Sequence, residues 1–324
     1  MTASATVMVL IAALCIDAAF GYPDQVFRRI GHPVSWIGSL IGVLEARMND
    51  PGQSAAARQA SGVVVLLILI GVAAGMAFVI ESLLAPTLLG KFVLAILAST
   101  LISGRSLFDH VRDVATALDR TGLDGARVAV GRIVGRNPQV LDESGVARAA
   151  IESLAENASD GVVAPAIWFL LLGLPGLAAY KAINTADSMI GHRTPRHEAF
   201  GWAAARLDDL VNLPASRITG GLFAAAAMLL PGASPADALG AMRRDAAKHR
   251  SPNAGWPESA MAGALGLKLN GPKTYGAVVV EDAYMGDGRR EATAADIRNA
   301  LALACRAWLI LVLALVVTWL TLRG

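Results

Sequence analysis

The sequence predicts an all-α protein that is embedded in a membrane. Hydrophobic residues make up 55% of its 324 residues and charged residues only 17%, against about 25% charged residues in a typical soluble domain. The mean hydropathy is +0.52, and several apolar runs approach the roughly 20 residues that a transmembrane helix needs. Runs of β-branched residues, which are typical of strands, are scarce. We therefore expect one membrane-embedded helical domain over residues 1–324.

Four apolar runs are predicted to cross the membrane completely. They cover residues 4–20, 61–84, 88–104 and 302–322, and the first is the weakest because it contains Asp17. Two further runs, 162–179 and 218–230, are interrupted by proline and glycine or are short. We expect these two to form re-entrant or buried helices rather than full spans.

Arginine distribution predicts the orientation of the spans. Arg28, Arg29, Arg47 and Arg58 lie between the first two spans, and seven arginines lie in residues 105–148, whereas the turn between the second and third spans has none. Because basic loops stay in the cytoplasm, the polar segments 105–161, 181–217 and 241–290 are expected on the cytoplasmic side. Their apolar residues recur at helical spacing, so a helical catalytic region is expected there.

Composition and motifs also exclude several classes of protein. The net charge of +2 does not suggest a nucleic-acid-binding protein. The two cysteines, Cys15 and Cys305, lie in apolar runs without a second cysteine nearby, which is typical of buried thiols rather than of a zinc or redox site. The sequence contains no GxxxxGK[ST] phosphate-binding loop.

The first polar cluster lies in the stretch Ile151–Gly161. Glu152 and Glu156 are four residues apart and therefore share one helix face, and Asn157 and Asp160 add oxygen atoms near the expected helix end. Such hard oxygen ligands are the ones that Mg²⁺ prefers. An ion pair between Arg148 and Glu152 is the alternative interpretation, and the spacing alone leaves it open.

The second cluster lies in Lys181–Arg193. Asn184, Asp187 and Ser188 fall at helical spacing on one stripe with Lys181. A polar stripe among Ala, Ile and Met is costly to bury unless it binds a ligand. Gly191 is expected to end the helix, so that the side chains of His192 and Arg193 turn toward that ligand.

The third cluster lies in Phe200–Asn212. Asp208 and Asn212 share a helix face, which is a spacing that can hold Mg²⁺ against phosphate oxygens. Asp209 adds a second carboxylate, and Arg206 could bind a phosphate through two hydrogen bonds. The alternative interpretation is a simple Arg206–Asp209 ion pair.

The fourth cluster combines basic residues with a loop rich in proline and glycine. Arg243 and Arg244 precede His249 and Asn253, and Tyr275 follows in a second Gly-Pro segment. This pattern is typical of a phosphate or carboxylate receptor. A basic patch that contacts anionic lipid is the alternative.

These motifs, taken together and in this order, resemble one known family. The resemblance rests on the His32-Pro33-Val34 segment with Trp36-Ile37-Gly38 and Leu44-Glu45, on Ile151–Gly161, on Lys181–Arg193, on Phe200–Asn212, on His249–Gly266 and on Gly271–Tyr275. It covers roughly residues 10–320. The sequence is similar to the adenosylcobinamide-phosphate synthases of cobalamin biosynthesis, which are integral to the bacterial cytoplasmic (inner) membrane.

The resemblance implies an enzyme that joins (R)-1-amino-2-propanol O-2-phosphate, or free aminopropanol in some organisms, to adenosylcobyric acid by an ATP-dependent amide ligation. ATP as cosubstrate and Mg²⁺ are implied with it. The expected metal ligands are the oxygen-bearing side chains Glu152, Glu156, Asn157, Asp160, Asp187, Asp208, Asp209 and Asn212. The expected substrate- and phosphate-binding residues are Arg193, Arg206, Arg243, Arg244, Asn184, Ser188, Asn253 and Tyr275. The amine must lose a proton, for which His192, His249 and Lys181 are the expected catalytic groups.

Two other classes remain as alternatives. An AmpE-like membrane regulator or sensor would share the fold without needing all four clusters. A transporter would carry ionisable residues in the middle of its spans, whereas here they are concentrated between spans. Membrane lipid is the expected surrounding, and the sequence leaves open whether the chain forms a homo-oligomer or associates with other enzymes of the pathway.

Overall fold

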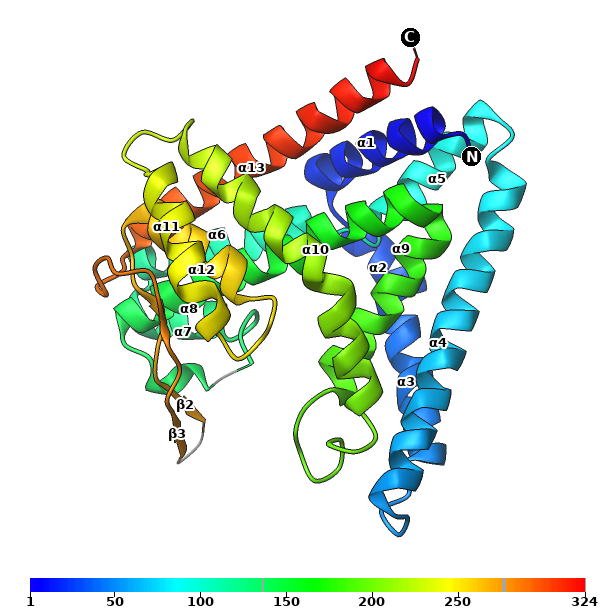
Figure 1. Cartoon of the computed structure of the whole chain (residues 1–324), viewed down its shortest axis with the longest axis horizontal. Helices are drawn as coiled ribbons and strands as arrows, with labels where there is room; N and C mark the ends of the chain where they lie inside the picture. Colours follow the sequence, from blue (N-terminus) through cyan, green and yellow to red (C-terminus); the bar gives the residue numbers. More distant parts are fainter. Residues whose placement is uncertain (136, 276–277, 324) are drawn as a thin grey trace. The chain divides into compact units, whose positions relative to one another are not determined.

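The computed structural model describes residues 1–135, 137–275 and 278–323, and in this part of the chain helices dominate. The α-helices, in chain order, are α1 (Ala3–Phe20), α2 (Asp24–Ile30), α3 (Pro33–Met48), α4 (Ala55–Leu84), α5 (Leu88–Ser99), α6 (Gly104–Arg120), α7 (Gly122–Val130), α8 (Glu143–Ala158), α9 (Ala164–Ile190), α10 (Trp202–Ala227), α11 (Pro235–Asp245), α12 (Gly255–Leu265) and α13 (Ala294–Thr321). Figure 1 follows them along the chain. The predicted all-α membrane fold is confirmed.

Short helical and extended elements complete the structure. The helical ones are η1 (Pro138–Val140), the π-helical turn η2 (Ser159–Val163) and η3 (Ala246–Lys248). The strands are β1 (Leu269–Asn270), β2 (Lys273–Tyr275), β3 (Val278–Val280) and β4 (Tyr284–Met285). They form two antiparallel pairs, β1 with β4 and β2 with β3.

Five helical stretches are long and apolar enough to cross a membrane. Four of them, Ala3–Phe20, Ala55–Leu84, Leu88–Arg120 and Ala294–Thr321, correspond to the four predicted spans, and the last ends one residue before the predicted end at 322. The fifth, Glu143–Ile190, contains the run 162–179 that was predicted to cross only in part. The chain is therefore a multi-pass membrane protein by the length and composition of its helices.

The run 162–179 does not form one straight helix. Gly173 has φ 68° and ψ −156°, which is outside the helical region, and Pro175 follows it, so α9 consists of two limbs that meet at this residue. The side chain of Glu81 on α4 lies at the junction, where its Oε2 accepts a hydrogen bond of 2.7 Å from the Leu174 N–H. Figure 1 shows the bend between the two limbs of α9.

The contacts within the chain divide it into two compact units. Unit 1 comprises residues 1–103, 164–212 and 315–324, and unit 2 comprises residues 104–163 and 213–314. In unit 1, α9 packs against α1, α3 and α4, and α1 also packs against α5. Close approach of α4 requires Gly62, because a Cβ there would lie 1.8 Å from the Phe200 carbonyl oxygen.

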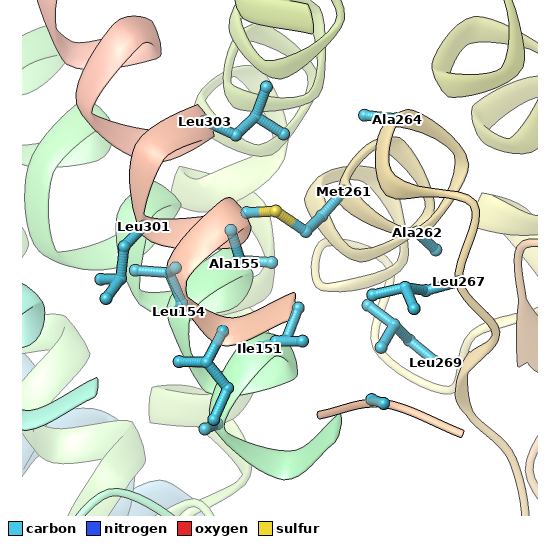
Figure 2. Close-up of a cluster of buried hydrophobic side chains, with 14 of the residues drawn as sticks. Ile151, Leu154, Ala155, Met261, Ala262, Ala264, Leu267, Leu269, Leu301 and Leu303 are labelled. Atoms are coloured by element: carbon cyan, nitrogen blue, oxygen red, sulfur yellow. The ribbon is translucent and has the colours of Figure 1, made fainter. Parts of the chain in front are cut away.

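Unit 2 contains the main hydrophobic core of the described residues. Its buried side chains come from α6, α7, α8, the last turns of α10, α11, α12, the first half of α13 and the segments in and around β1 and β4. Figure 2 shows Ile151 and Leu154 of α8 with Met261 of α12, near Leu301 and Leu303 of α13. This core fixes α8, which carries the first polar cluster.

Candidate functional site

Polar side chains of α9 and α10 form a hydrogen-bonded chain inside unit 1. The Tyr180 hydroxyl donates to Asn212 Oδ1 at 2.9 Å, and Asn212 Nδ2 donates to Asp208 Oδ2 at 3.0 Å. On the other carboxylate oxygen, Asp208 Oδ1 accepts from Asn184 Nδ2 at 3.3 Å. Tyr180 and Asn212 are each 1% exposed and Asp208 is 9% exposed. The predicted face shared by Asp208 and Asn212 is thus present, and α9 supplies donors to it.

The carboxylates of Asp187 and Asp209 lie near this hydrogen-bonded group and influence Asp208. Burial and, to a smaller extent, the negative charge of Asp187 raise the pKa of Asp208, hydrogen bonds from Asn184 and Asn212 act in the opposite direction, and the pKa that results is about 7. Burial also raises the pKa of Asp209, and the charges of Arg206 and Arg193 oppose that change. Because carboxylates influence each other this strongly only at short range, Asp187, Asp208 and Asp209 belong to one site.

The end of α9 positions Asp187. The helix ends at Ile190, as the sequence predicts, and the Gly191 N–H donates to the Asp187 backbone carbonyl at 2.7 Å. A Cβ at residue 191 would lie 2.0 Å from Asp187 Oδ1. A side chain at residue 191 would therefore have to displace the Asp187 carboxylate, and its Cβ would also lie 2.7 Å from the Asp187 backbone carbonyl oxygen.

This group fits a Mg²⁺ ion that is completed by substrate. Two carboxylates of α9 and α10, Asp187 and Asp208, lie beside the carboxamides of Asn184 and Asn212, so hard oxygen ligands are available. Within the described residues, no group of three His, Cys, Asp or Glu side chains is arranged to hold a metal by itself. Mg²⁺ commonly binds through one or two carboxylates, with water and substrate phosphates filling the remaining positions.

Basic groups surround the acids of unit 1. Arg206 lies 3.7 Å from Asp209 across an exposed ion pair, which is the alternative interpretation of that motif. His192 and Arg193 are exposed on the loop after α9. The Ser188 hydroxyl donates a hydrogen bond of 2.9 Å to the Asn184 backbone carbonyl, one turn earlier in α9.

Lys181 lies farther back on α9, near His32. Burial lowers the pKa of His32, and the positive charge of Lys181 lowers it further. His32 Nδ1 accepts a hydrogen bond from the Val34 N–H at 3.1 Å and so caps α3. The neutral imidazole is favoured in this arrangement, because a proton on Nδ1 would remove the acceptor.

The loop that carries His192 and Arg193 is anchored to α3 and α4. Glu45 Oε1 accepts from Arg196 Nε at 2.7 Å and from His197 Nε2 at 2.8 Å. These hydrogen bonds outweigh the effect of burial, and the pKa of the Glu45 carboxyl is lowered.

Two more side chains hold the backbone of the same loop. Asn49 Nδ2 donates to the Arg196 carbonyl at 3.0 Å, and the Arg58 guanidinium donates to the same oxygen and to Asn49 Oδ1. Glu45 lies in one of the sequence motifs but had no predicted role, and Asn49 and Arg58 were not among the predicted site residues. The separation of about 150 residues between Glu45 and His197 explains why no local pattern indicates the contact.

The first polar cluster has a different arrangement. Glu152 is 6% exposed, and its Oε1 accepts a hydrogen bond of 2.9 Å from the Asn270 backbone N–H. Asn270 has φ 55°, so the carboxylate of Glu152 stabilises an unusual backbone turn. Glu156 and Asn157 are exposed, and Asp160 lies half-buried in the π-helical turn η2. π-Helical turns occur frequently at functional sites.

The fourth cluster also belongs to unit 2, and an internal acid organises it. Asp245 accepts from Arg244 at 2.7 Å, from Lys248 at 2.9 Å and from the Gly286 N–H at 3.1 Å. Burial raises the pKa of Asp245, but these hydrogen bonds outweigh it and the pKa is lowered. Arg244 also pairs with Asp287 at 2.9 Å. The side chains of Arg243 and Arg244 are both exposed.

Ser216 and Arg217, which were not predicted as site residues, contact the loop that follows this cluster. Asn253 Oδ1 accepts from Ser216 Oγ at 3.1 Å and from Arg217 Nη1 at 3.0 Å, and the Arg217 guanidinium stacks 4.7 Å from the Trp256 ring centre. His249 Nδ1 accepts from the Ser251 N–H at 3.0 Å. No pattern near Arg217 in the sequence indicates its contact with Asn253, which lies 36 residues further along the chain.

The structure thus brings together part of the predicted set. The residues Lys181, Asn184, Asp187, Ser188, His192, Arg193, Arg206, Asp208, Asp209 and Asn212 lie in unit 1. The residues Glu152, Glu156, Asn157, Asp160, Arg243, Arg244, His249 and Asn253 lie in unit 2. The side chain of Tyr275 is outside the described part of the chain. That the two sets form one site stays a prediction.

Comparison with known proteins gives one consistent result. The family model described as CobD/Cbib protein matches residues 10–304. A protein of Sinorhizobium sp named "Cobalamin biosynthesis protein CobD" is 51% identical over 303 residues, which is 92% of this chain and 94% of the relative. Proteins of the same name from Rhodobacter capsulatus and Brucella suis are each 50% identical, over 92% and 91% of both chains. No solved structure matches the chain.

Proposed function

The chain belongs to the CobD/Cbib family of cobalamin biosynthesis proteins, and we propose that it is the membrane enzyme that forms an amide between adenosylcobyric acid and (R)-1-amino-2-propanol O-2-phosphate. Free aminopropanol is the alternative amine. ATP would be consumed, and adenosylcobinamide phosphate, or adenosylcobinamide with the free amine, would be the product. The family places the chain in cobalamin biosynthesis, and the ligation itself is our proposal.

The proposed chemistry follows from the weakness of a carboxylate as an electrophile. The carboxylate oxygen of the corrinoid would attack the γ-phosphorus of ATP, forming an acyl phosphate and releasing ADP. The amine would then attack the acyl carbon, and inorganic phosphate would leave as the C–N bond forms. One proton leaves the amine nitrogen in this step, and a nearby base would take it.

The observation that carries the proposal is the acid and amide group between α9 and α10. Asp187, Asp208, Asn184 and Asn212 would hold Mg²⁺ together with phosphate oxygens of the nucleotide. The ion would supply positive charge to the phosphoryl oxygens. The hydrogen bond from Tyr180 fixes the Asn212 carboxamide, so this ligand would be oriented before substrate binds.

Cationic side chains would bind the remaining negative charge. In unit 1, Arg193 and Arg206 lie close enough to the acids to influence the Asp209 carboxyl. In unit 2, Arg243 is the better candidate of the adjacent pair, because Arg244 is already paired with Asp245 and Asp287. His192, His249 and Lys181 are the proposed proton acceptors.

We further propose that the site faces the cytoplasm. ATP is available there, and the arginine-rich segments 21–60 and 105–148 favour that side by the distribution of basic loops. A regulator of the AmpE type is the competing function. The polar group between α9 and α10 favours the enzyme, because a sensor would not need buried carboxylates beside oriented carboxamides.

Product formation by the purified protein tests the proposal. The protein in nanodiscs would receive adenosylcobyric acid, Mg²⁺, ATP and either amine in turn, and ADP and the corrinoid amide would be measured. We expect one ADP for each amide formed. A deletion strain should grow on cobinamide but not on cobyric acid. Growth on cobyric acid, or a purified protein that forms no amide with either amine, would reject the enzyme.

Replacement of the proposed ligands separates the site from the fold. Alanine at Asp187 or Asp208 should lower turnover by at least about 100-fold, because each carboxylate would hold charge in the transition state, while membrane insertion is unchanged. Glu156→Ala tests whether the first cluster takes part as predicted. Asp237→Ala, an exposed acid at the start of α11, is the matched control and should retain full turnover. Near-normal turnover of the Asp187 and Asp208 variants would reject the metal assignment.

A further inference from the structure

The short helix α2 has almost no cover from the rest of the protein. It is seven residues long, and the side chains of Gln25 through Ile30 are all exposed. An isolated helix of this length is not stable in water, because the first turn is costly to form and few hydrogen bonds repay it. A helix that is ordered but uncovered therefore points to a surrounding that is absent from the isolated chain.

Side chains on α2 are divided between two faces. Val26, Phe27 and Ile30 fall within an arc of about 100° on a helix of 3.6 residues per turn, and Arg28 and Arg29 lie outside that arc. Phe27 and Ile30 are 51% and 57% exposed. Apolar side chains on one face and arginines on the other are typical of a helix that lies in the plane of a membrane surface.

Side chains of the protein, rather than water, donate hydrogen bonds to the backbone carbonyls at the end of α2. Its terminal carbonyls would otherwise need water as hydrogen-bond donor. Instead, the Trp36 indole N–H donates to the Ile30 carbonyl at 3.0 Å, and the Tyr22 hydroxyl donates to the Gly31 carbonyl at 2.7 Å. Trp and Tyr are also the residues enriched at the boundary between membrane and water.

Chain continuity places α2 at that boundary. The candidate span α1 ends at Phe20, and α2 begins at Asp24. Three intervening residues reach at most about 14 Å between these two positions, even when fully extended. In Figure 1 both helices are coloured blue and follow each other directly. Helix α2 therefore lies close to the membrane surface at which the first span ends.

We infer that α2 is an interfacial helix that binds an anionic bilayer surface, with Val26, Phe27 and Ile30 inserted among the acyl chains and Arg28 and Arg29 at the lipid phosphates. The positive charge of the two arginines complements anionic headgroups, which favours lipid over a second copy of this chain. Each arginine near such a surface contributes about fivefold to binding, so the pair contributes about 30-fold.

A nitroxide spin label on the apolar arc tests this inference independently of any enzymatic activity. Cys15 and Cys305, which were expected to be buried, are exposed and would be replaced by alanine. Phe27→Cys would then be labelled in the full chain. The protein would be placed in nanodiscs of phosphatidylcholine with or without phosphatidylglycerol. Collision of the label with oxygen, which concentrates in lipid, and with a water-soluble nickel complex would be measured. Val140→Cys, from a residue of similar exposure (57%) in unit 2, is the control.

We expect the label at residue 27 to collide with oxygen readily and with nickel several-fold less than the label at residue 140. Arg28→Gln with Arg29→Gln should raise the nickel collisions at residue 27 in anionic discs and have little effect in neutral ones. Ile30→Cys, on the same arc, replaces the probe if the Phe27 variant does not fold.

Three results would overturn the inference. Nickel collisions equal to those at Val140 would mean that α2 lies in water. Exclusion of both reagents would mean that protein covers it. Dipolar broadening between labels would mean that a second copy of the chain does so.

Discussion

Asp208→Asn is expected to stabilise the protein even as it removes a proposed ligand. A carboxyl whose pKa rises from about 4 in the unfolded protein to about 7 in the folded protein lowers the free energy of unfolding by about 4 kcal/mol at pH 8, because folding buries its negative charge. Asparagine keeps the shape without the charge. It loses one of the two hydrogen bonds that Asp208 accepts, from Asn184 or Asn212, which costs about 1 kcal/mol. The expected net gain is about 2–3 kcal/mol at pH 8.

The sign of this effect depends on pH. Below about pH 4 the carboxyl is protonated in both folded and unfolded protein, and Asp208 carries no penalty. The penalty grows as pH rises from about 4, and it reaches its full size above the folded pKa of about 7. At pH 5 it is about 1.4 kcal/mol and nearly cancels the lost hydrogen bond. The variant should therefore be close to the wild type at pH 5 and more stable at pH 8.

Asp245→Asn is the matched control, with the opposite expected sign. The pKa of Asp245 is lowered by its hydrogen bonds to Arg244, Lys248 and the Gly286 N–H, which together outweigh burial. Its contribution to stability is therefore present above about pH 4 and is lost as pH falls through the folded pKa. Asparagine at this position should destabilise the protein by about 2 kcal/mol at both pH 5 and pH 8.

The free energy of unfolding would be measured by titration with dodecyl sulfate in mixed micelles. Both variants and the wild type would be compared at the two pH values, with a chelator present so that no divalent ion binds to Asp208. A loss of stability at pH 8 in Asp208→Asn, similar to that in Asp245→Asn, would refute the reasoning. So would a gain that does not change between pH 5 and pH 8.

Two further predictions concern the packing of unit 1. Gly62→Ala should destabilise the protein by about 1–3 kcal/mol in the same titration, because its Cβ would lie 1.8 Å from the Phe200 carbonyl oxygen. Gly71→Ala on the same helix is the control and should be neutral or stabilising, because no atom lies within 4 Å of the added Cβ. Equal effects of the two substitutions would contradict the close packing at Gly62. Glu45→Ala should remove about 2 kcal/mol of local stability from the loop 192–201, so hydrogen exchange there should speed up by about 30-fold, and unchanged exchange would show that the anchor does not hold the loop.

Local sequence patterns predicted those parts of the site that lie on one helix. Helical spacing is enough to place Asp208 and Asn212 on one face, and Gly191 at the end of α9 follows from the same reasoning. Hydropathy alone indicated four full spans and the interrupted run 162–179. These features depend only on residues that are close to one another along the chain, so one sequence is enough to predict them.

Contacts between distant segments could not be predicted in this way. Glu152 has the spacing of a metal ligand, yet it accepts a hydrogen bond from the Asn270 backbone, 118 residues along the chain. Tyr180 reaches Asn212 only because α9 and α10 lie side by side. Arg244 was expected at a phosphate, and in the structure it pairs with the buried Asp245 and the exposed Asp287. In each case the structure shows a tertiary contact that spacing along the sequence does not indicate, and the predicted roles of these side chains stay predictions.

The junction at Gly173 shapes how the polar end of α9 can reside in a bilayer. The limb after it has 17 residues, about 25 Å of helix, which falls short of the hydrocarbon thickness of about 30 Å. The first backbone N–H groups of a helix have no partner within the helix. The carboxylate of Glu81, three residues before the end of α4, accepts from the Leu174 N–H and also lies 3.7 Å from the amino group of Met1. One acid on α4 thereby joins the start of this limb to the first residue of the chain. The limb then ends at Ile190, close to the Gly201 backbone and so to the part of the chain that packs on Gly62 near the beginning of α4.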